Sequence, residues 1–440
     1  MSISVQAYSV VAGEKRKVAV KIMGAAAAAS VRRSFHFALL LDVSGSMEGS
    51  RINAVRRTLH LLIDALQDND KISLISYNSS ATCLTFGHVV NAEARVALHA
   101  MVDGLVADGG TNIESAITLL GSRYNECPVD SVFLLTDGHI NVGIRTATGL
   151  LRVATTLMPT GIPINTLGYG SAHNSLMLRD MATHTRGSYT YADTDELLPA
   201  IIGDIVGGLA SEVARNASLA FNGEGWKCLE MGTVEGDTNY FVGMLIADKP
   251  QWVVLEGPVT AEFPTLTLSY SIDGIRSTTT VATPIDVVGD DAVMVAEQCD
   301  RAYAAQAFAR VTDAIARGEV EVAREALTEL ENRLTASAAA ARPLVLQLRA
   351  QLDEMRAALT TARHGAPSVT RLMSNTCALG MQRGFFTTPA ASTGLSTIPL
   401  TNTFSSPSQQ GATVVLTARF TQTTMDTDDT GMPTRRPTLS

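Results

Sequence analysis

Apolar runs alternate with helical patterns from residue 34 to residue 210. The run at 35–41 is apolar except for His36, as a strand buried on both faces should be. At 51–67 the apolar residues recur at helical spacing along one stripe. Further strands are expected at 72–77, 82–90, 132–135, 162–167 and 188–191. This alternation predicts a doubly wound, mainly parallel α/β sheet of Rossmann-like type, covered by helices on both faces.

Three polar residues mark where helices of this region should begin. A side-chain oxygen just before a helix can accept a hydrogen bond from a free backbone N–H group of the first turn. We expect Asn91 to cap a helix to residue 101, and Thr111 to cap one to residue 124. Thr194 should cap the last helix, which ends near the pair Gly207-Gly208.

After residue 211 the pattern changes to short strands. They are expected at 213–221, 240–246, 252–255 and 266–272, and Asp273-Gly274 is a strong hairpin-turn signal after the last. Residues 211–289 should therefore form a small β-sandwich. Residues 1–33 hold two more short strands around Gly13, which could complete that sandwich. In that case residues 34–210 are an insertion into it.

The segment 290–365 is rich in Ala, Glu and Arg and predicts a helical region. Helices are expected at 291–317, 320–334 and 343–363, with Gly318 ending the first and Pro343 in the first turn of the third. An intramolecular bundle is the simpler interpretation, and an oligomer seam the alternative. Thr, Ser, Pro and Gly dominate the tail at 366–440, which we expect to be mostly flexible, with 412–420 as a possible edge strand.

Three separated segments carry oxygen-bearing side chains at predicted loops. Asp42, Ser44 and Ser46 follow the first buried strand, Thr111 ends the segment DGGT, and Asp137 follows the strand at 132–135. Ligands of open parallel sheets gather beyond the carboxyl ends of the strands. The pattern therefore brings these segments toward one edge.

All candidate ligand atoms of this set are oxygens, which hard cations prefer. The sequence predicts a Mg²⁺ site, which Mn²⁺ or Ca²⁺ could also occupy. The hydroxyls are neutral, and the two carboxylates supply negative charge directly or through bound water. If both carboxylates stay outside the inner shell, the ion keeps much of its charge. An open coordination position would then attract an acidic group of a partner.

These segments resemble the metal-ion-dependent adhesion site (MIDAS) of von Willebrand factor type A (VWA) domains. The likeness rests on LLLDVSGSM at 39–47, DGGTNIESAI at 108–117 and LLTDGHINVG at 134–143, and it spans about residues 34–210. The resemblance implies that Ser44, Ser46 and Thr111 coordinate the metal directly, with Asp42 and Asp137 nearby. It also implies a protein-binding module that recognises an exposed acidic residue.

A weaker resemblance covers more of the chain. VWA proteins with a following β-region and a helical C-terminal segment include plant RING-type ubiquitin ligases. Those ligases carry a cysteine-rich zinc module before the VWA domain. This chain has no cysteine before Cys83, so ligase activity is not implied.

Catalytic motifs are weak. Ser46 lacks the GxSxG surroundings of a hydrolase nucleophile, and Gly168-Tyr169-Gly170-Ser171 lacks the GK[ST] ending of a phosphate loop. His139 and His173 follow strands and could line the rim of the metal face, although a surface histidine is the simpler interpretation. We therefore expect no enzyme activity.

Net charge and cysteine content indicate which kinds of partner and which cellular compartment suit this chain. The net charge of −9 with short, isolated basic clusters disfavours nucleic acid as a partner. Five scattered cysteines without a CxxC pair fit a reducing compartment, and we find neither a membrane span nor a secretory signal, so we expect a cytoplasmic protein. The alternatives to a binding module are a client-recruiting subunit of an AAA+ ATPase complex and a structural or assembly protein, which would oligomerise through the helical segment.

Overall fold

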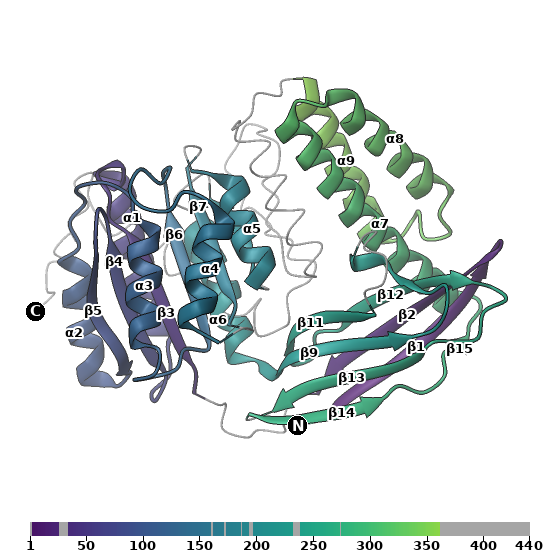
Figure 1. Cartoon of the computed structure of the whole chain (residues 1–440), viewed down its shortest axis with the longest axis horizontal. Coiled ribbons are helices and arrows are strands. Elements are labelled where there is room, and N and C mark those ends of the chain that lie inside the picture. The colour runs from purple at the N-terminus through teal and green to yellow at the C-terminus, as the bar shows by residue number, and fades with distance from the viewer. Residues whose placement is uncertain are drawn as a thin grey trace, which may run out of the picture. The chain divides into compact units, whose positions relative to one another are not determined.

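The computed structural model describes residues 2–25, 34–159, 162–170, 173–185, 187–192, 197–231, 238–272 and 274–360. They form two compact units (Figure 1). The first, called here the α/β unit, contains the described residues from 34 to 210. The second, the sandwich–helix unit, contains the described residues of 2–25 and 211–360. The predictions for Thr194, for Asp273 and for the tail from 366 lie outside the described residues.

The α/β unit is built on one six-stranded sheet with the order β5-β4-β3-β6-β7-β8. Its strands are β3 (His36–Asp42), β4 (Lys71–Tyr77), β5 (Ala81–Val89), β6 (Ser131–Thr136), β7 (Ile164–Tyr169) and β8 (Tyr189–Ala192). All neighbouring pairs are parallel except β4 and β5. Every residue of β3 and β6 is buried, and the apolar interior of each strand fits burial on both faces. The predicted mainly parallel α/β fold is confirmed.

Helices pack on both faces of this sheet (Figure 1). Helix α1 packs beside α2 and α6, whereas α4 packs beside α3 and α5. Their bounds are α1 (Ser50–Ala65), α2 (Ala92–Asp103), α3 (Ile113–Arg123), α4 (Ala147–Leu157), α5 (Ser175–Thr185) and α6 (Leu197–Ala210), and a short 3-10 helix η1 (Gly45–Met47) precedes α1. Helices α4 and α5 are not among the elements predicted from the sequence. Thr146, whose hydroxyl accepts from the backbone N–H of Gly149, is the cap that could have revealed α4.

One predicted helix cap is confirmed and one is wrong. Asn91 caps α2 by accepting a hydrogen bond from the backbone N–H of Ala94 at 2.8 Å. Helix α3 is capped by Asn112, which accepts from the backbone N–H of Ser115 at 3.1 Å, and not by Thr111. The shift by one residue leaves the hydroxyl of Thr111 available for another role.

The sandwich–helix unit contains two further sheets, with the orders β10-β12-β2-β1-β15 and β11-β9-β13-β14. The strands are β1 (Ile3–Ala12), β2 (Lys15–Gly24), β9 (Glu212–Asn222), β10 (Lys227–Cys228), β11 (Asn239–Ile246), β12 (Gln251–Pro258), β13 (Thr265–Ile272), β14 (Ile275–Thr280) and β15 (Ile285–Asp286). One apolar core joins the sheets, with Val20 and Val253 from the first and Leu219 and Leu268 from the second. The two sheets therefore form a sandwich. Strand β2 pairs with β12, so the hairpin at 3–24 shares a sheet with strands from beyond residue 226.

Three helices follow: α7 (Asp290–Arg317), α8 (Val320–Ala336) and α9 (Pro343–Thr360). Gly318 ends α7 in the left-handed region at φ +76°, where glycine has no Cβ penalty. Helix α7 packs on the five-stranded sheet through Val295, Cys299 and Ala302. Another short 3-10 helix, η2 (Leu229–Met231), carries Glu230, whose carboxylate pairs with the fully buried Arg301 at 2.5 Å.

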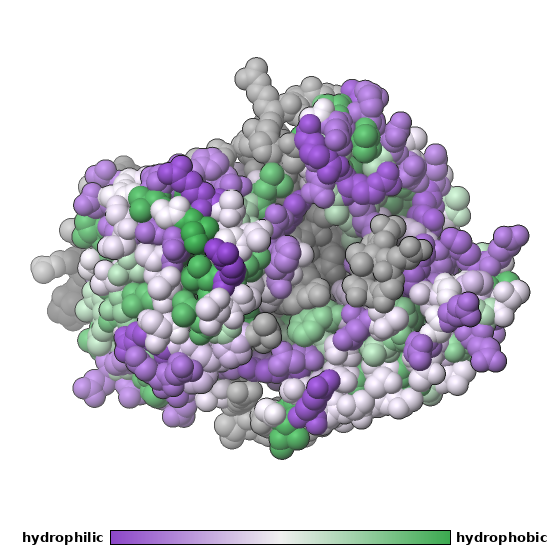
Figure 2. Space-filling view, viewed as in Figure 1, coloured by the Kyte–Doolittle hydropathy of each residue, from purple (hydrophilic) through white to green (hydrophobic). Residues whose placement is uncertain are grey.

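The outer surface of the helical segment is polar. In Figure 2 the surface over α8 is mostly hydrophilic, and the exposed residues of that helix are largely charged. The oligomer seam, the alternative to an intramolecular bundle, stays a prediction. No helix of the described residues is long and apolar enough to cross a membrane.

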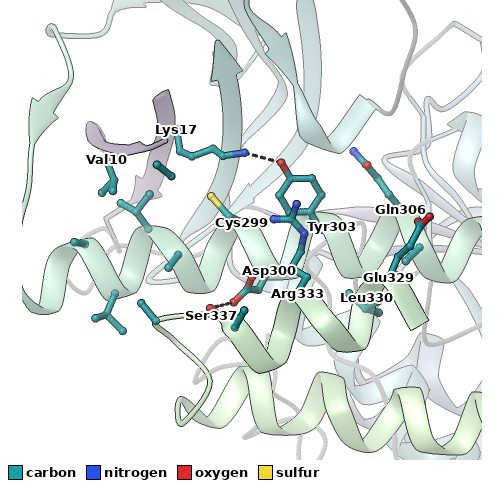
Figure 3. Close-up of a pocket in the computed structure, with 18 of the residues that line it drawn as sticks. Val10, Lys17, Cys299, Asp300, Tyr303, Gln306, Glu329, Leu330, Arg333 and Ser337 are labelled. Atoms are coloured by element: carbon teal, nitrogen blue, oxygen red, sulfur yellow. Dashed lines mark hydrogen bonds between the residues drawn. The ribbon is translucent and has the colours of Figure 1, made fainter. Parts of the chain in front are cut away.

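A cavity of about 890 Å³ lies between β1, β2, α7 and α8 (Figure 3). The amine of Lys17 donates to the hydroxyl of Tyr303 at 2.6 Å, and Asp300 accepts from Ser337. Burial lowers the pKa of Lys17 to about 8. The guanidinium of Arg333 stacks 3.5 Å from the ring centroid of Tyr303. These polar groups are mostly engaged with one another, so the cavity suggests no particular ligand.

Candidate metal centre

Two adjacent parallel strands bring the acidic residues of the candidate site to the same edge of the sheet. Strands β3 and β6 pair with Leu41 opposite Leu135, so the chain reaches Asp42 and Asp137 just beyond this register. The loop before α3 joins the same edge. The backbone N–H of Gly45 donates to the carbonyl of Gly109 at 3.0 Å, and that of Asp108 donates to the carbonyl of Val43 at 2.8 Å. The three predicted segments therefore converge.

The hydroxyl and carboxylate oxygens of these segments lie close together. Ser44 Oγ lies 3.0 Å from Ser46 Oγ, and the Ser46 hydroxyl donates to Asp137 Oδ1 at 2.6 Å. A Cβ added to Gly138 would lie 3.4 Å from Ser46 Oγ and 3.9 Å from Thr111 Oγ1. The serine and threonine hydroxyls therefore approach the same small space, which the absence of a side chain at Gly138 keeps open.

Asp42 is a buried carboxylate without a cationic partner among the described residues. Oδ1 accepts from the backbone N–H of Ser44 at 2.9 Å, and Oδ2 accepts from the hydroxyl of Thr136 at 2.6 Å. Burial raises the pKa of Asp42 to about 6, and the charge of Asp137 acts in the same direction. A cation beside this carboxylate would offset the cost of its buried charge.

Asp137 has a partner that the sequence analysis missed. Arg51 Nη1 lies 2.5 Å from Asp137 Oδ2 and donates to the carbonyl of Ser46 at 3.1 Å. The side chain of Asp137 is fully buried, whereas that of Arg51 is 38% exposed. Arg51 lies at the start of α1, the helix that follows the DxSxS segment. This position in the sequence could have indicated that Arg51 lies near the candidate site.

Thr111 is held by its backbone, which leaves its hydroxyl free to act. Asn141 Oδ1 accepts from the backbone N–H of Thr111 at 2.8 Å, and the carbonyl of Thr111 accepts from the N–H of Asn141 at 3.2 Å. Within the described part of the chain the Thr111 hydroxyl makes no hydrogen bond, although the residue is only 3% exposed. A hydroxyl that bonds to no group of the described residues, on a residue that is itself almost buried, is available to a metal ion.

The donor set fits a hard divalent cation. Three hydroxyls and two carboxylates offer oxygen alone, which suits Mg²⁺, Mn²⁺ or Ca²⁺. Ser46 is exposed while Asp42, Ser44, Thr111 and Asp137 are buried, so the cluster opens to solvent at Ser46. No group of three or more His, Cys, Asp or Glu in the described residues could hold a metal ion, so an ion here depends on the hydroxyls.

The two histidines considered for the rim have different positions. His139 is exposed. His173 is buried: Nε2 lies 2.8 Å from the hydroxyl of Tyr189, and Nδ1 lies 2.8 Å from the carbonyl of Gly170. Burial lowers the pKa of His173 to about 4. The expectation that it lies at the rim or on the surface is wrong, because Tyr189 from the neighbouring strand encloses it.

Comparisons with known proteins agree with this architecture. Residues 37–204 match the profile of the family described as von Willebrand factor type A domain. An uncharacterized protein of Synechocystis is 30% identical over 165 residues, which cover 37% of this chain and 38% of that protein. The E3 ubiquitin-protein ligase WAV3 of Arabidopsis thaliana is 30% identical over 120 residues, which cover 25% of this chain and 16% of the ligase.

A solved structure resembles more of the chain. The von Willebrand factor type A protein from Catenulispora acidiphila aligns with a TM-score of 0.62 at 15% identity, over 86% of this chain and 96% of that one. At this identity the likeness shows the fold alone. The chain spans well under half the length of the Synechocystis and Arabidopsis relatives, so their activities and partners do not transfer with the match.

Proposed function

Since residues 37–204 form a VWA domain, a domain type that commonly mediates protein–protein interaction, we propose that this chain is a cation-dependent protein-binding module that recognises an acidic group on its partner. The observation that carries the proposal is the convergence of three hydroxyls beside two buried carboxylates. A bound Mg²⁺ would supply positive charge and an open coordination position for the partner's carboxylate.

The residues of the cluster have separate roles. The hydroxyls of Ser44, Ser46 and Thr111 would hold the ion as neutral ligands. Asp42 fixes the start of the loop through the backbone N–H of Ser44, and Asp137 orients the hydroxyl of Ser46. Because Arg51 already balances the charge of Asp137, the uncompensated carboxylate is Asp42.

The same geometry disfavours a nucleophilic role for Ser46. Its hydroxyl donates to the carboxylate of Asp137, and it has no histidine partner among the described residues. A hydroxyl held this way lacks the adjacent base that activates a serine nucleophile.

Metal titration of the full chain tests the site. We expect one Mn²⁺ per chain by calorimetry, competed by Mg²⁺, and binding weakened at least tenfold in Ser44→Ala and Thr111→Ala. Ser122→Ala is the control, because this exposed serine bonds only to the carbonyl of Leu119 in its own helix. Equal affinity of all four proteins would refute the metal site.

Partner capture tests the function. Protein immobilised in Mg²⁺ should retain a partner that EDTA releases, and the Ser44→Ala chain should retain none. A partner that both proteins hold equally in EDTA would show that binding does not use the ion.

A further inference from the structure

The sequence His-x-x-x-Asp occurs on two neighbouring helices of the α/β unit. It runs from His60 to Asp64 on α1 and from His99 to Asp103 on α2. Residues four apart lie on the same face of a helix. Because α1 packs beside α2, the two copies of the motif meet.

The four side chains form a crossed arrangement. His60 Nδ1 lies 2.7 Å from His99 Nδ1. His60 Nε2 lies 3.0 Å from Asp103 Oδ1, on the other helix, and His99 Nε2 lies 3.1 Å from Asp64 Oδ1. Each histidine therefore contacts a carboxylate through Nε2 and the other histidine through Nδ1.

The hydrogen bonds to the two aspartates decide which nitrogen of each histidine remains available to bind a proton or a metal ion. An ionised carboxylate only accepts hydrogen bonds, so each Nε2 must be the donor to its aspartate. That tautomer presents a lone pair on each Nδ1, and the two lone pairs face one another. Two nitrogen lone pairs at 2.7 Å repel unless a proton lies between them, or unless the rings turn so that both lone pairs point at one metal ion beside the line that joins the nitrogens.

We propose that this histidine pair binds one transition-metal ion of the class that prefers imidazole, with Ni²⁺ or Cu²⁺ favoured over Zn²⁺. The two Nδ1 atoms are the ligands, and binding releases the proton that the rings otherwise share. Asp64 and Asp103 act behind the ligands by fixing the ring tautomer, as carboxylates commonly do at histidine metal sites.

The distance between the nitrogens decides which ions fit best. With metal–nitrogen bonds of about 2.0–2.1 Å, two neighbouring ligands at a right angle are about 2.9 Å apart, and tetrahedral ligands about 3.3 Å. From 2.7 Å the rings must separate least for the right-angled geometry, which is that of tetragonal Ni²⁺ and Cu²⁺.

The site is accessible and separate from the hydroxyl cluster. The side chains of His60 and His99 are each 30% exposed, so the pair lies at the surface of the α/β unit. The pair supplies two protein ligands, which agrees with the lack of any larger His, Cys, Asp or Glu metal cluster in the described residues. An ion here would clip α1 to α2.

Calorimetric titration with NiCl₂ tests the proposal on the tag-free full chain, saturated with Mg²⁺. We expect one Ni²⁺ per chain, with affinity lowered at least tenfold in His60→Gln and in His99→Gln. Asp103→Asn should lose about tenfold, since removal of such a supporting group typically costs 10–100-fold. His184→Gln should match the parent, because this exposed histidine bonds to the backbone of its own helix.

Glutamine is a good helix former, so these surface variants should fold, which circular dichroism checks. Parent-like Ni²⁺ binding by His60→Gln, or no binding by the parent, overturns the proposal. Asp42→Asn separates the two sites: it should lose the Mg²⁺ response and keep the Ni²⁺ site. Loss of Ni²⁺ binding in Asp42→Asn alone would put the ion at the hydroxyl cluster and also overturn the proposal.

Discussion

Replacing Asp42 with asparagine should stabilise the metal-free protein at neutral pH. The side chain is fully buried, and burial raises the pKa of its carboxyl from 3.8 to about 6. Each pKa unit corresponds to about 1.4 kcal/mol, so the ionised carboxylate opposes folding by about 3 kcal/mol above pH 6. Because the folded pKa is raised, the folded state binds this proton more tightly. The free energy of unfolding therefore falls as the pH rises from about 4 to about 6.

Asparagine resembles the protonated form of Asp42 and cannot ionise. It keeps an acceptor for the backbone N–H of Ser44. In EDTA at pH 8 we expect Asp42→Asn to unfold about 6–12 °C above the parent, from about 3 kcal/mol in a unit of this size. Below pH 4 the difference should vanish. Asp68→Asn, which loses only an exposed ion pair with Arg95, is the control.

Thermal denaturation followed by circular dichroism measures this, with and without Mg²⁺. An ion at 100 times its dissociation constant stabilises the parent by about 2.7 kcal/mol. The variant should show no such gain. A variant less stable than the parent in EDTA at pH 8, or one stabilised by Mg²⁺ as much as the parent, would refute the reasoning.

Other substitutions test further contacts. Arg51→Gln leaves its buried carboxylate partner unpaired, so the metal-free protein should lose about 1–3 kcal/mol and gain more from Mg²⁺ in thermal denaturation. Gly168→Ala puts a Cβ 2.1 Å from the His173 ring and should cost about 1–3 kcal/mol by urea unfolding; an unchanged midpoint would contradict this packing. Glu230→Gln removes the negative charge beside the buried Arg301 and should cost about 3–5 kcal/mol. Tryptophan fluorescence measures the unfolding of this variant, since both tryptophans lie in the sandwich–helix unit. A decrease of less than 1 kcal/mol in its free energy of unfolding would argue against the ion pair.

The sheet and the convergence of the metal segments could be predicted because they depend on local pattern. Strands β3 and β6 are buried along their whole length and apolar in their interiors, and a parallel sheet places the loops after its strands at one edge. The pattern therefore brought Asp42 and Asp137 together from positions far apart in sequence. The role of Asp42 and Asp137 beside a bound metal ion stays a prediction.

The features that the pattern could not predict depend on tertiary contacts. In the sequence, Arg51 looks like an ordinary charged residue on the solvent-exposed surface of a helix. Its ion pair with Asp137 forms only because the fold brings the two residues together at the edge of the sheet. His173 follows a strand like many surface histidines, yet Tyr189 buries it. At the start of α3 both Thr111 and Asn112 are residue types that can cap a helix. In the structure Asn112 is the cap, while the backbone N–H and carbonyl of Thr111 form hydrogen bonds with Asn141.

The pairing of β2 with β12 sets an order of events during synthesis. The hairpin at 3–24 leaves the ribosome early, but its neighbour in the sheet begins at residue 251. At typical translation rates the intervening stretch of roughly 230 residues takes about 10–50 s. Throughout this delay the edge of β2 has no strand beside it, while the complete α/β unit emerges and has time to fold. A ribosome paused just before β12 is made should therefore carry a folded α/β unit behind an unfinished sheet, exposed to chaperones.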